Sequence, residues 1–337
     1  MDASIPTSDQ LQLRGAEQAE WHALAKAKSD EVFGGEVFVR GVVEVSNFCR
    51  ENCRYCGMRR DNRELARYRA NFDQLAELLL HHRPESITDM NFQAGEDPLV
   101  VREVVVPLVK LLREETNLGV SVCLGTLNDQ LYRELWDAGA RMYIIKFEIG
   151  DQDLYAQMEA PGKWEERLEH IRRLSSDGWF VSSGFISGLP GQGIESTLKN
   201  FEVARDLPLD GCSVSPFIPG EATPLMDRQS ADLDLTLNCM AALRHLRPDW
   251  VIPSVSALNL TAPGEGYRRG IAAGANLCTI NLTPPAIRDD YLLYKRSRFI
   301  VTEELILNAI EEAGMRPSTA GMQRLFTKQV ATVSEAL

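Results

Sequence analysis

The sequence predicts an α/β protein whose strands close into a (βα)8 TIM barrel. Short apolar runs alternate with amphipathic stretches along most of the chain, a pattern typical of βα units joined into a parallel sheet. Eight of the apolar runs are candidate strands, which is the number that a complete barrel needs. The length of 337 residues also fits, because chains of this size routinely form one α/β barrel.

The predicted strands and helices alternate in order along the chain. Candidate strands occupy residues 37–45, 86–92, 120–124, 141–148, 179–184, 211–217, 250–256 and 276–281. Helical patterns lie between them, for example at 72–82, 129–138, 164–175 and 196–206. Gly or Asp often stands just before the next strand, which marks the end of a helix and a short loop. Because barrel active sites lie at the carboxyl ends of the strands, we expect functional residues in the loops that follow them.

Two terminal segments are expected outside the barrel, which should span residues 36–300. Residues 1–35 are polar and have a helical pattern, so we expect an N-terminal helical cap. Residues 301–337 are expected to form a C-terminal extension packed on the barrel, with one helix at 303–313 followed by a loose tail.

Composition and charge narrow the range of partners. The hydrophobic content of 44% and the charged content of 25% are ordinary for a soluble globular protein. The net charge of −12 argues against nucleic acid or an anionic membrane as a partner, since both are polyanions. No apolar run approaches the length of a bilayer span, and the N-terminus lacks the pattern of a secretory signal. We therefore expect a cytoplasmic protein whose seven cysteines remain free.

Three cysteines stand within eight residues after the first candidate strand. Cys49, Cys53 and Cys56 have the spacing C-x3-C-x2-C. A loop of this length can wrap an iron–sulfur cubane and offer one thiolate to each of three irons. Such clusters are normally held by four cysteines, so one iron would lack a protein ligand and would be open to a small molecule. The motif therefore predicts a catalytic cluster.

Two alternative interpretations use the same cysteines. A structural zinc site normally has four ligands in two pairs, but the nearest histidines, His81 and His82, lie more than twenty residues away in a helical pattern. A protein that only transfers electrons would be expected to supply a complete set of four cysteines. Neither alternative explains a set of three.

With Tyr55 directly before the last cysteine, the motif resembles that of the radical S-adenosylmethionine (SAM) enzymes. The resemblance extends from about residue 38 to the C-terminus and implies a barrel of the radical SAM type, a [4Fe-4S] cluster and SAM as cofactors. In that family the open iron binds SAM, and one electron cleaves it to methionine and a 5′-deoxyadenosyl radical. It also implies an external reductant of the ferredoxin or flavodoxin type and a small-molecule or protein-carried substrate. No nucleic acid or membrane partner is expected.

A turn after the second candidate strand implies a contact with SAM. In the sequence Q-A-G-E-D-P at 93–98, Gln93, Gly95 and Glu96 occupy the place of a family turn that receives the amino group of SAM. An ordinary turn is the alternative, because Gly, Asp and Pro are common turn residues. Tyr55, as the aromatic residue of the cysteine motif, is also implied as a cofactor contact.

A G-x-I-x-G motif follows the fifth candidate strand. Its members are Gly184, Ile186 and Gly188. In the family this motif packs against adenine, which implies that the two glycines let the backbone lie flat against the ring. Ile186 would then add an apolar contact.

The resemblance also implies anchors for the ribose and the carboxylate of SAM. Glu148 ends the fourth candidate strand, where related enzymes place an acidic residue that binds the ribose hydroxyls. Arg167, in the next helical stretch, is implied to pair with the carboxylate, for which its planar guanidinium is suited. Lys146 lies two residues before Glu148 and therefore on the same strand face. We expect it to meet SAM, substrate or Glu148.

Within the family, the chain resembles the group that contains biotin synthase, methylornithine synthase and HydE, a maturase of [FeFe]-hydrogenase. It is most similar to HydE-like chains in the segments 46–62, 93–98, 188–192 and 216–219. HydE-like chains commonly carry Arg-His-Glu at the fourth strand end, whereas Lys146, Phe147 and Glu148 stand here. The implied function is of the hydrogenase-maturation type. Sulfur insertion and the carbon-skeleton rearrangement of methylornithine synthase are the alternatives.

Sulfur insertion would need an auxiliary cluster inside the barrel. Cys123 matches one ligand of the biotin synthase cluster, but the other positions do not match. Cys278 and Cys212 could join Cys123 at a common interior point and hold a different second cluster, as in lipoyl synthase-like enzymes. The alternative is that these are buried core residues, as free cysteines often are. Substrate-facing candidates, placed by strand position alone, are Ser254, Ser256, Thr279, Asn281 and Cys123.

Overall fold

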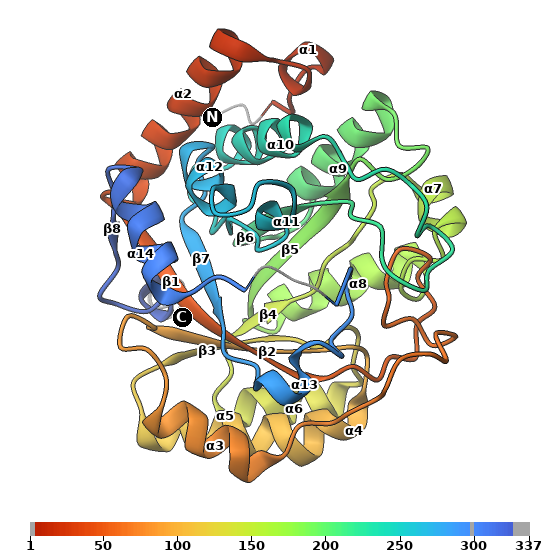
Figure 1. Ribbon diagram of the computed structural model, residues 1–337, viewed down its shortest axis with the longest axis vertical. Coiled ribbons are helices and arrows are strands. Elements are labelled where there is room, and N and C mark those ends of the chain that lie inside the picture. The colour runs from red at the N-terminus through yellow and green to blue at the C-terminus, as the bar shows by residue number, and fades with distance from the viewer. Residues whose placement is uncertain (1–3, 297–299, 326–337) are drawn as a thin grey trace.

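The computed structural model describes residues 4–296 and 300–325, and its centre is a curved parallel sheet (Figure 1). The strands are β1 (Glu36–Ser46), β2 (Asp89–Ala94), β3 (Gly119–Cys123), β4 (Met142–Ile144), β5 (Phe180–Ser187), β6 (Gly211–Pro216), β7 (Leu277–Asn281) and β8 (Arg316–Pro317). Seven of them follow the order β6-β5-β4-β3-β2-β1-β7, and β8 pairs with the start of β1. All named pairs are parallel, so the strands end at the same side of the sheet.

The predicted barrel is confirmed, but its seventh strand, expected at 250–256, is reduced to two isolated bridges. One bridge joins this segment to β6 and the other joins it to β7, so the segment closes the gap between the two edge strands. Two residues keep this segment from forming a regular strand. Pro253 has no N–H to donate to a neighbouring strand. The N–H of Ile252 donates to the side-chain oxygen of Asn276, at 2.8 Å, and not to a main-chain carbonyl. We call this closure, built from residues 251–253 and Asn276, the seam.

β4 is shorter than the strand predicted at 141–148. The hydroxyl of Ser183 in β5 accepts the N–H of Phe147 at 3.1 Å and donates to the carbonyl of Ile145 at 2.8 Å. These side-chain bonds interrupt the regular ladder after Ile144, although the main-chain N–H groups of Ile145 and Glu148 still donate to carbonyls of β5 at 3.0 Å each. Glu148 then takes a left-handed φ of 65°, which turns the chain at the top of the sheet.

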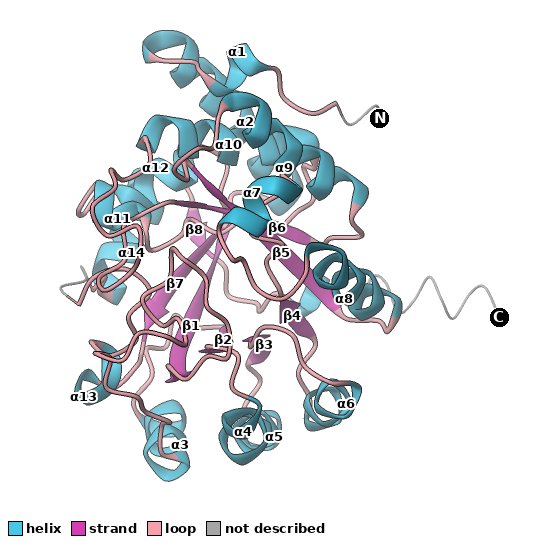
Figure 2. Ribbon diagram, turned by 90° about the vertical axis from the view of Figure 1, so that its right-hand side faces the viewer, coloured by secondary structure: helices cyan, strands magenta, loops and turns pink. Residues whose placement is uncertain are grey.

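Helices cover the outer face of the sheet (Figure 2). They are α1 (Ser8–Leu11), α2 (Gly15–Phe33), α3 (Phe72–His81), α4 (Pro98–Val100), the π-helical segment η1 (Val101–Val105), α5 (Val106–Glu115), α6 (Asp129–Ala138), α7 (Gln152–Gln157), α8 (Trp164–Ser176), α9 (Ile194–Asp206), α10 (Leu233–Leu246), α11 (Leu258–Thr261), α12 (Gly266–Ala272), α13 (Pro285–Arg288) and α14 (Glu303–Glu312). The four helices predicted between strands correspond to α3, α6, α8 and α9, with ends that differ by at most two residues. Asn71 and Asn128 cap α3 and α6, because their side-chain oxygens accept main-chain N–H groups. None of the described helices combines the length and apolar character needed to cross a bilayer.

The two terminal segments lie on neighbouring parts of the barrel. α1 and α2 pack against α10, where Asn238 donates to two main-chain carbonyls of the N-terminal segment at 3.0 Å each. Trp21 of α2 stacks on His245 of α10 with ring centroids 3.8 Å apart. α14 packs against α12, and β8 lies beside β1. The tail expected after residue 325 lies outside the described residues.

Strand alternation sorts the side chains into two sets. In β7, Thr279 and Asn281 face the barrel interior, whereas Cys278 packs in the core between sheet and helices. β6 shows the same pattern, with Ser213 inside and Cys212 in the core. Because successive side chains of a strand point to opposite faces, this assignment is fixed for every regular strand. The interior thus receives mostly polar residues from β6 and β7.

Replacement of Asn276 by Ala should weaken the seam. The Asn276 side-chain oxygen accepts the N–H of Ile252 and Nη2 of Arg244, and all three residues are fully buried. A buried donor left without its partner typically costs about 1–3 kcal/mol. The urea midpoint of the cluster-free protein should therefore fall, whereas Asn117→Ala, at an exposed position, should leave it unchanged. Equal midpoints for both variants would contradict this role of Asn276.

Candidate active site

A cavity of about 360 Å³ lies inside the barrel and reaches the carboxyl ends of the strands. Cys49, Cys53 and Cys56 all line it, and all three are free thiols. They come from the loop that follows β1, at the end of the barrel where parallel α/β barrels carry their active sites. The structure thus brings together, on one cavity wall, the three residues of the sequence motif.

The cysteine loop is held by hydrogen bonds to other parts of the protein. Asn47 is fully buried, and its amide donates to two main-chain carbonyls from distant segments at 2.7 Å each. The guanidinium of Arg67 donates to the carbonyls of Asn47, Met58 and Arg59 over 2.5–2.9 Å. Gly57 packs so closely that a Cβ there would lie 2.4 Å from the carbonyl oxygen of another loop. The loop conformation is therefore set by the protein itself.

The turn after β2 lies directly against the cysteine loop. A Cβ at Gly95 would lie 2.3 Å from the carbonyl oxygen of Phe48 and 2.8 Å from Cβ of Cys49. The main-chain N–H of Glu96 donates to Sγ of Cys49 at 3.4 Å. Gln93, at the end of β2, lines the same cavity. Glycine is needed at position 95 because no side chain fits between the two segments.

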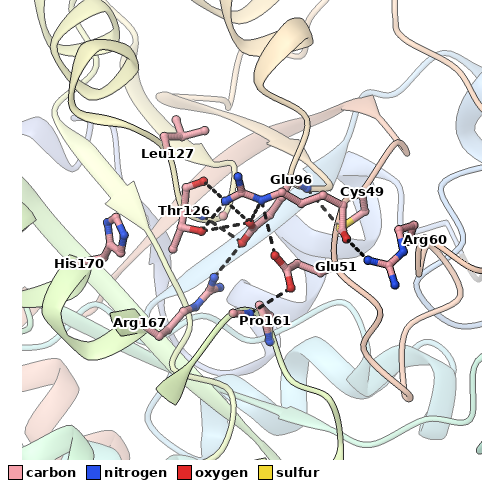
Figure 3. A network of polar contacts seen from close by, with 12 residues as sticks. Cys49, Glu51, Arg60, Glu96, Thr126, Leu127, Pro161, Arg167 and His170 are labelled. Atoms are coloured by element: carbon pink, nitrogen blue, oxygen red, sulfur yellow. Dashed lines mark hydrogen bonds and ion pairs between the residues drawn. The ribbon is translucent and has the colours of Figure 1, made fainter. Parts of the chain in front are cut away.

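The carboxylate of Glu96 is the centre of a buried polar network (Figure 3). Its Oε1 accepts Nη1 of Arg167 at 2.9 Å and the N–H of Thr126 at 3.0 Å. Its Oε2 accepts Nε of Arg50 at 2.9 Å and the hydroxyl of Thr126 at 3.0 Å. The network therefore joins the cysteine loop, the turn after β2, the loop after β3 and helix α8.

Glu96 and Arg167 are both charged in this network. Burial raises the pKa of Glu96, but Arg167, the N–H of Thr126 and Arg50 together outweigh it, and the pKa is lowered. Burial likewise disfavours the charged form of Arg167, and the nearby acidic groups, Glu96 first among them, together raise its pKa. Arg167 also donates from Nε to the carbonyl of Lys146 at 2.8 Å. Its Nη2 has no hydrogen-bond partner within residues 4–296 and 300–325, although Arg167 lines the cavity.

Lys146 and Glu148 form an ion pair on the cavity wall. Nζ of Lys146 lies 3.2 Å from the carboxylate of Glu148, and both residues line the cavity. The left-handed backbone of Glu148 and its bridge to β5 hold this carboxylate at the strand ends. Of the three partners expected for Lys146, the protein itself supplies Glu148.

The G-x-I-x-G motif places only its central residue at the cavity. Ile186 lines the cavity, as does Tyr55 from the cysteine loop. Gly184 and Gly188 are not among the residues that line it. A Cβ at Gly184 would lie 2.1 Å from Oγ of Ser213, and one at Gly188 would lie 2.5 Å from Cβ of Ala231. The structure explains both glycines by close packing within the protein.

The cysteines considered for a second cluster do not converge. Cys123, the last residue of β3, lines the cavity. Cys212 and Cys278 are fully buried in the core outside the sheet, on the opposite strand face. Of the two alternatives for these thiols, a common interior point does not form, because the alternation of β6 and β7 directs two of them away from the cavity. Cys212 and Cys278 behave as core residues.

Most of the expected substrate-facing residues do face the cavity. Ser256, Thr279, Asn281 and Cys123 line it. Ser254 does not, because its hydroxyl donates to the carbonyl of Tyr267 at 3.2 Å on the helix side of the seam segment. The expectation for Ser254 assumed a regular strand at 250–256, which the seam replaces.

Sequence reasoning missed Arg40, which lies deep in the cavity. This residue is 9% exposed, and its Nη2 donates to the hydroxyl of Thr279 at 3.3 Å. Its Nε is buried and has no hydrogen-bond partner among the described residues. The signal was present in the sequence, since Arg40 has the same strand parity as Val42 and Glu44, which also line the cavity.

The three motif thiols are neutral in the protein as it stands. Burial raises the pKa of Cys49 and Cys53, and it raises that of Cys56 to about 12. Thiolate ligation by a metal would therefore release protons. Within residues 4–296 and 300–325, no group of three or more His, Cys, Asp or Glu side chains is placed so that it could hold a single metal ion.

Replacement of Gly95 by Ala should displace the cysteine loop. The added methyl group would meet main-chain and Cβ atoms of that loop, which cannot rotate away. Overpacking of this kind typically costs about 1–3 kcal/mol, so the variant should have a lower thermal midpoint and retain less iron after reconstitution. Gly193→Ala is the matched control, because nothing lies within 4 Å of the added atom. Iron retention equal to that of the control would rule out the proposed contact.

The sequence is similar to one family model and to curated enzymes. The Radical SAM superfamily signature matches residues 43–221, which is more than half of the chain. The [FeFe] hydrogenase maturase subunit HydE of Thermotoga maritima is 31% identical over 303 residues, covering 87% of this chain and 86% of HydE. The 3-methylornithine synthase of Methanosarcina acetivorans is 26% identical over 314 residues, covering 91% and 88% of the two chains.

The fold has a close counterpart among solved structures. The crystal structure of methylornithine synthase (PylB) superposes with a TM-score of 0.81 at 23% identity, covering 94% of this chain and 95% of the other. At that identity the match establishes the fold alone. Together with the signature over residues 43–221 and the 31% identity to HydE, it shows that this chain is an enzyme of the radical SAM superfamily, whose members use a [4Fe-4S] cluster and SAM.

Proposed function

We propose that this enzyme is HydE-like, that Cys49, Cys53 and Cys56 hold its cluster, and that its substrate is a small molecule bound inside the barrel. The observation that carries the proposal is the position of the three thiols on the wall of the barrel cavity, beside the Glu96–Arg167 network. The identity of 31% over almost the whole of HydE supports the choice within the family.

The chemistry of the site fits a three-cysteine cluster. Three free thiols lie on one loop that the protein holds in place without a metal. The N–H of Glu96 already donates to Sγ of Cys49, and hydrogen bonds to ligating sulfurs tune such clusters. Three thiolates leave one iron of a cubane open. When bound, the cluster and SAM together supply a 5′-deoxyadenosyl radical, which abstracts hydrogen from the substrate.

The residues around the thiols are suited to orient SAM. We assign the carboxylate of SAM to Arg167, whose Nη2 has no partner among the described residues, and the amino group to the turn at Gln93, Gly95 and Glu96. Glu148 is assigned to the ribose and Ile186 to the adenine ring. The role of Glu96 is then mainly to orient Arg167 through their ion pair, which fixes the guanidinium before SAM arrives.

The three thiols lie inside the barrel, on the wall of its cavity. Shielding a carbon radical from side reactions is a general task of the protein in cofactor enzymes. We propose a ferredoxin or flavodoxin as the source of electrons and the cytoplasm as the site of action. The substrate is a small molecule or a group carried by a protein. In the second case only the reacting group enters the cavity of about 360 Å³, and the carrier protein stays outside the barrel.

The HydE-like assignment is tested by replacing HydE in an anaerobic maturation mixture for [FeFe]-hydrogenase that lacks only this component. Hydrogen evolution should be restored by this chain. A mixture that stays inactive, while 3-methylornithine appears when the enzyme is incubated with a cell extract, would favour the second candidate. That candidate rests on the 26% identity to 3-methylornithine synthase over 91% of the chain.

Serine at any one of Cys49, Cys53 or Cys56 should abolish SAM cleavage. Each change removes one thiolate from a set that has no spare member on the loop. After anaerobic reconstitution, 5′-deoxyadenosine and methionine should fall to background by liquid chromatography. Cys239→Ser, in the core of α10, is the matched control and should retain cleavage. A single motif variant that still formed 5′-deoxyadenosine would refute the assignment.

Replacement of Arg167 by Ala should weaken SAM binding without loss of iron. Removal of a hydrogen bond to a charged group costs about 1.5–3 kcal/mol, so the Kd should rise roughly tenfold or more. Equilibrium dialysis with labelled SAM measures the Kd, and iron analysis checks the cluster. Arg172→Ala, exposed on the same helix, should bind SAM normally. Unchanged affinity in the Arg167 variant would exclude it as the anchor.

A further inference from the structure

Cys123 is the one cysteine outside the motif that lines the cavity. All seven cysteines lie in the described part of the chain, and Cys212, Cys239 and Cys278 are fully buried in the core. Cys123 ends β3 and pairs in register with Gln93 of β2, so it lies on the same wall as the turn beside the cysteine loop. Unlike the core cysteines it is only partly buried, and its exposed part faces the cavity.

A second feature of the same cavity is the unsatisfied Arg40. Its guanidinium is buried against the cavity, and its Nε lacks a partner among the described residues. A buried donor without a protein partner is unfavourable, and a water molecule, an ion or a bound group can satisfy it. Arg40 and Cys123 lie close enough for the charge of each to shift the pKa of the other. The cavity therefore places a cation beside a sulfur that could become negative.

Cys123 carries its hydrogen at neutral pH. Burial, together with the negative charge of Glu148, raises the pKa of this thiol to about 11, in spite of the nearby cations Lys146, Arg40 and Arg167. A neutral thiol has an S–H bond that is weaker than an aliphatic C–H bond. Transfer of its hydrogen atom to a carbon radical is therefore favourable.

We propose that Cys123 is the hydrogen-atom donor of the cavity and returns a hydrogen atom to a carbon radical formed there. The proposal rests on the proposed function, because it requires that carbon radicals arise beside Cys123. It adds a role that neither the three motif cysteines nor the SAM-orienting residues provide, namely the quenching of the radical at the end of a turnover.

The step balances as a hydrogen-atom transfer followed by a reduction. The S–H bond of Cys123 breaks, one C–H bond forms, and the sulfur becomes a thiyl radical. One electron from the external reductant of the ferredoxin or flavodoxin type then gives the thiolate, and one proton from water restores the thiol. Arg40 stabilises the transient thiolate, which would otherwise be a buried unpaired charge.

Four tyrosines line the cavity and are the competing donors, namely Tyr55, Tyr267, Tyr291 and Tyr294. The hydroxyl of Tyr267 donates to the carbonyl of Thr279 at 2.7 Å, so its hydrogen is already engaged. Tyr291 is fully buried and has Gln93 as a hydrogen-bond partner. Thiol S–H and phenolic O–H bonds are similar in strength, but a thiol transfers its hydrogen atom to an alkyl radical much faster than a phenol does. Cys123 is therefore the favoured donor of the cavity.

Isotope transfer from solvent tests the proposal without knowledge of the substrate. Reconstituted enzyme is equilibrated in D2O, freed of small thiols, and allowed to cleave SAM with dithionite in the absence of substrate. The 5′-deoxyadenosyl radical must then take its hydrogen from the cavity wall, and the thiol of Cys123 carries exchangeable deuterium. Mass spectrometry of 5′-deoxyadenosine reports the donor.

The parent enzyme should give mainly singly deuterated 5′-deoxyadenosine. In Cys123→Ser, whose O–H bond is too strong to serve, the deuterated fraction should fall at least fivefold, whereas Cys278→Ser should match the parent. A deuterated fraction that is unchanged in Cys123→Ser, or absent from the parent, would overturn the proposal. If none of the proteins forms 5′-deoxyadenosine, the proposed function fails, and this inference fails with it.

A second readout needs no turnover. In the cluster-free protein, methyl methanethiosulfonate should label Cys123 faster than Cys212 or Cys278, as judged by peptide mass spectrometry. Protection of Cys123 equal to that of Cys278 would show that its thiol does not reach the cavity and would also overturn the proposal. Iron content of Cys123→Ser equal to that of the parent separates this role from cluster binding.

Discussion

The ion pair between Glu96 and Arg167 is the interaction on which the rest of the site depends. The same carboxylate is bonded by Arg50 of the cysteine loop and by Thr126 after β3, so four separate segments meet at one buried charge. A buried carboxylate is stable only while it is fully paired. None of these segments can shift without leaving part of that charge unpaired. The barrel positions the carboxyl ends of its strands, and the Glu96 carboxylate holds together the loops that follow β1, β2 and β3.

The architecture was largely predictable because local sequence patterns indicate most strands and helices of the barrel. Alternating apolar and amphipathic segments give the strands and helices, and Asn71 and Asn128 mark two helix starts. The two departures both arise where a side chain interrupts a regular backbone ladder. Ser183 bonds two main-chain groups beyond the end of β4, and Asn276 accepts the N–H of Ile252 in the seventh segment. Neither interruption can be inferred from local sequence, because the partners are distant along the chain.

At the site, the spacing of the cysteines was sufficient to predict which residues meet, whereas strand parity was needed for the rest. Cys278 and Thr279 are neighbours in β7, so they cannot both face the interior. The same rule would have identified Arg40 beside Val42 as an inward-facing cation. The glycines at 184 and 188 could not have been explained from sequence, because the neighbours that exclude a side chain come from β6 and from residue 231.

The way in which the cysteine loop is anchored has a consequence for how the enzyme matures. Asn47, Arg67 and Gly57 order the loop through contacts with polypeptide alone. The entropy lost in shaping the loop is therefore offset during folding and not at metal uptake. In a zinc finger, by contrast, metal binding and folding are one event. Here a folded apoprotein with a preformed cysteine loop can exist before iron binds. Delivery of the cluster and synthesis of the chain can therefore be separated in time.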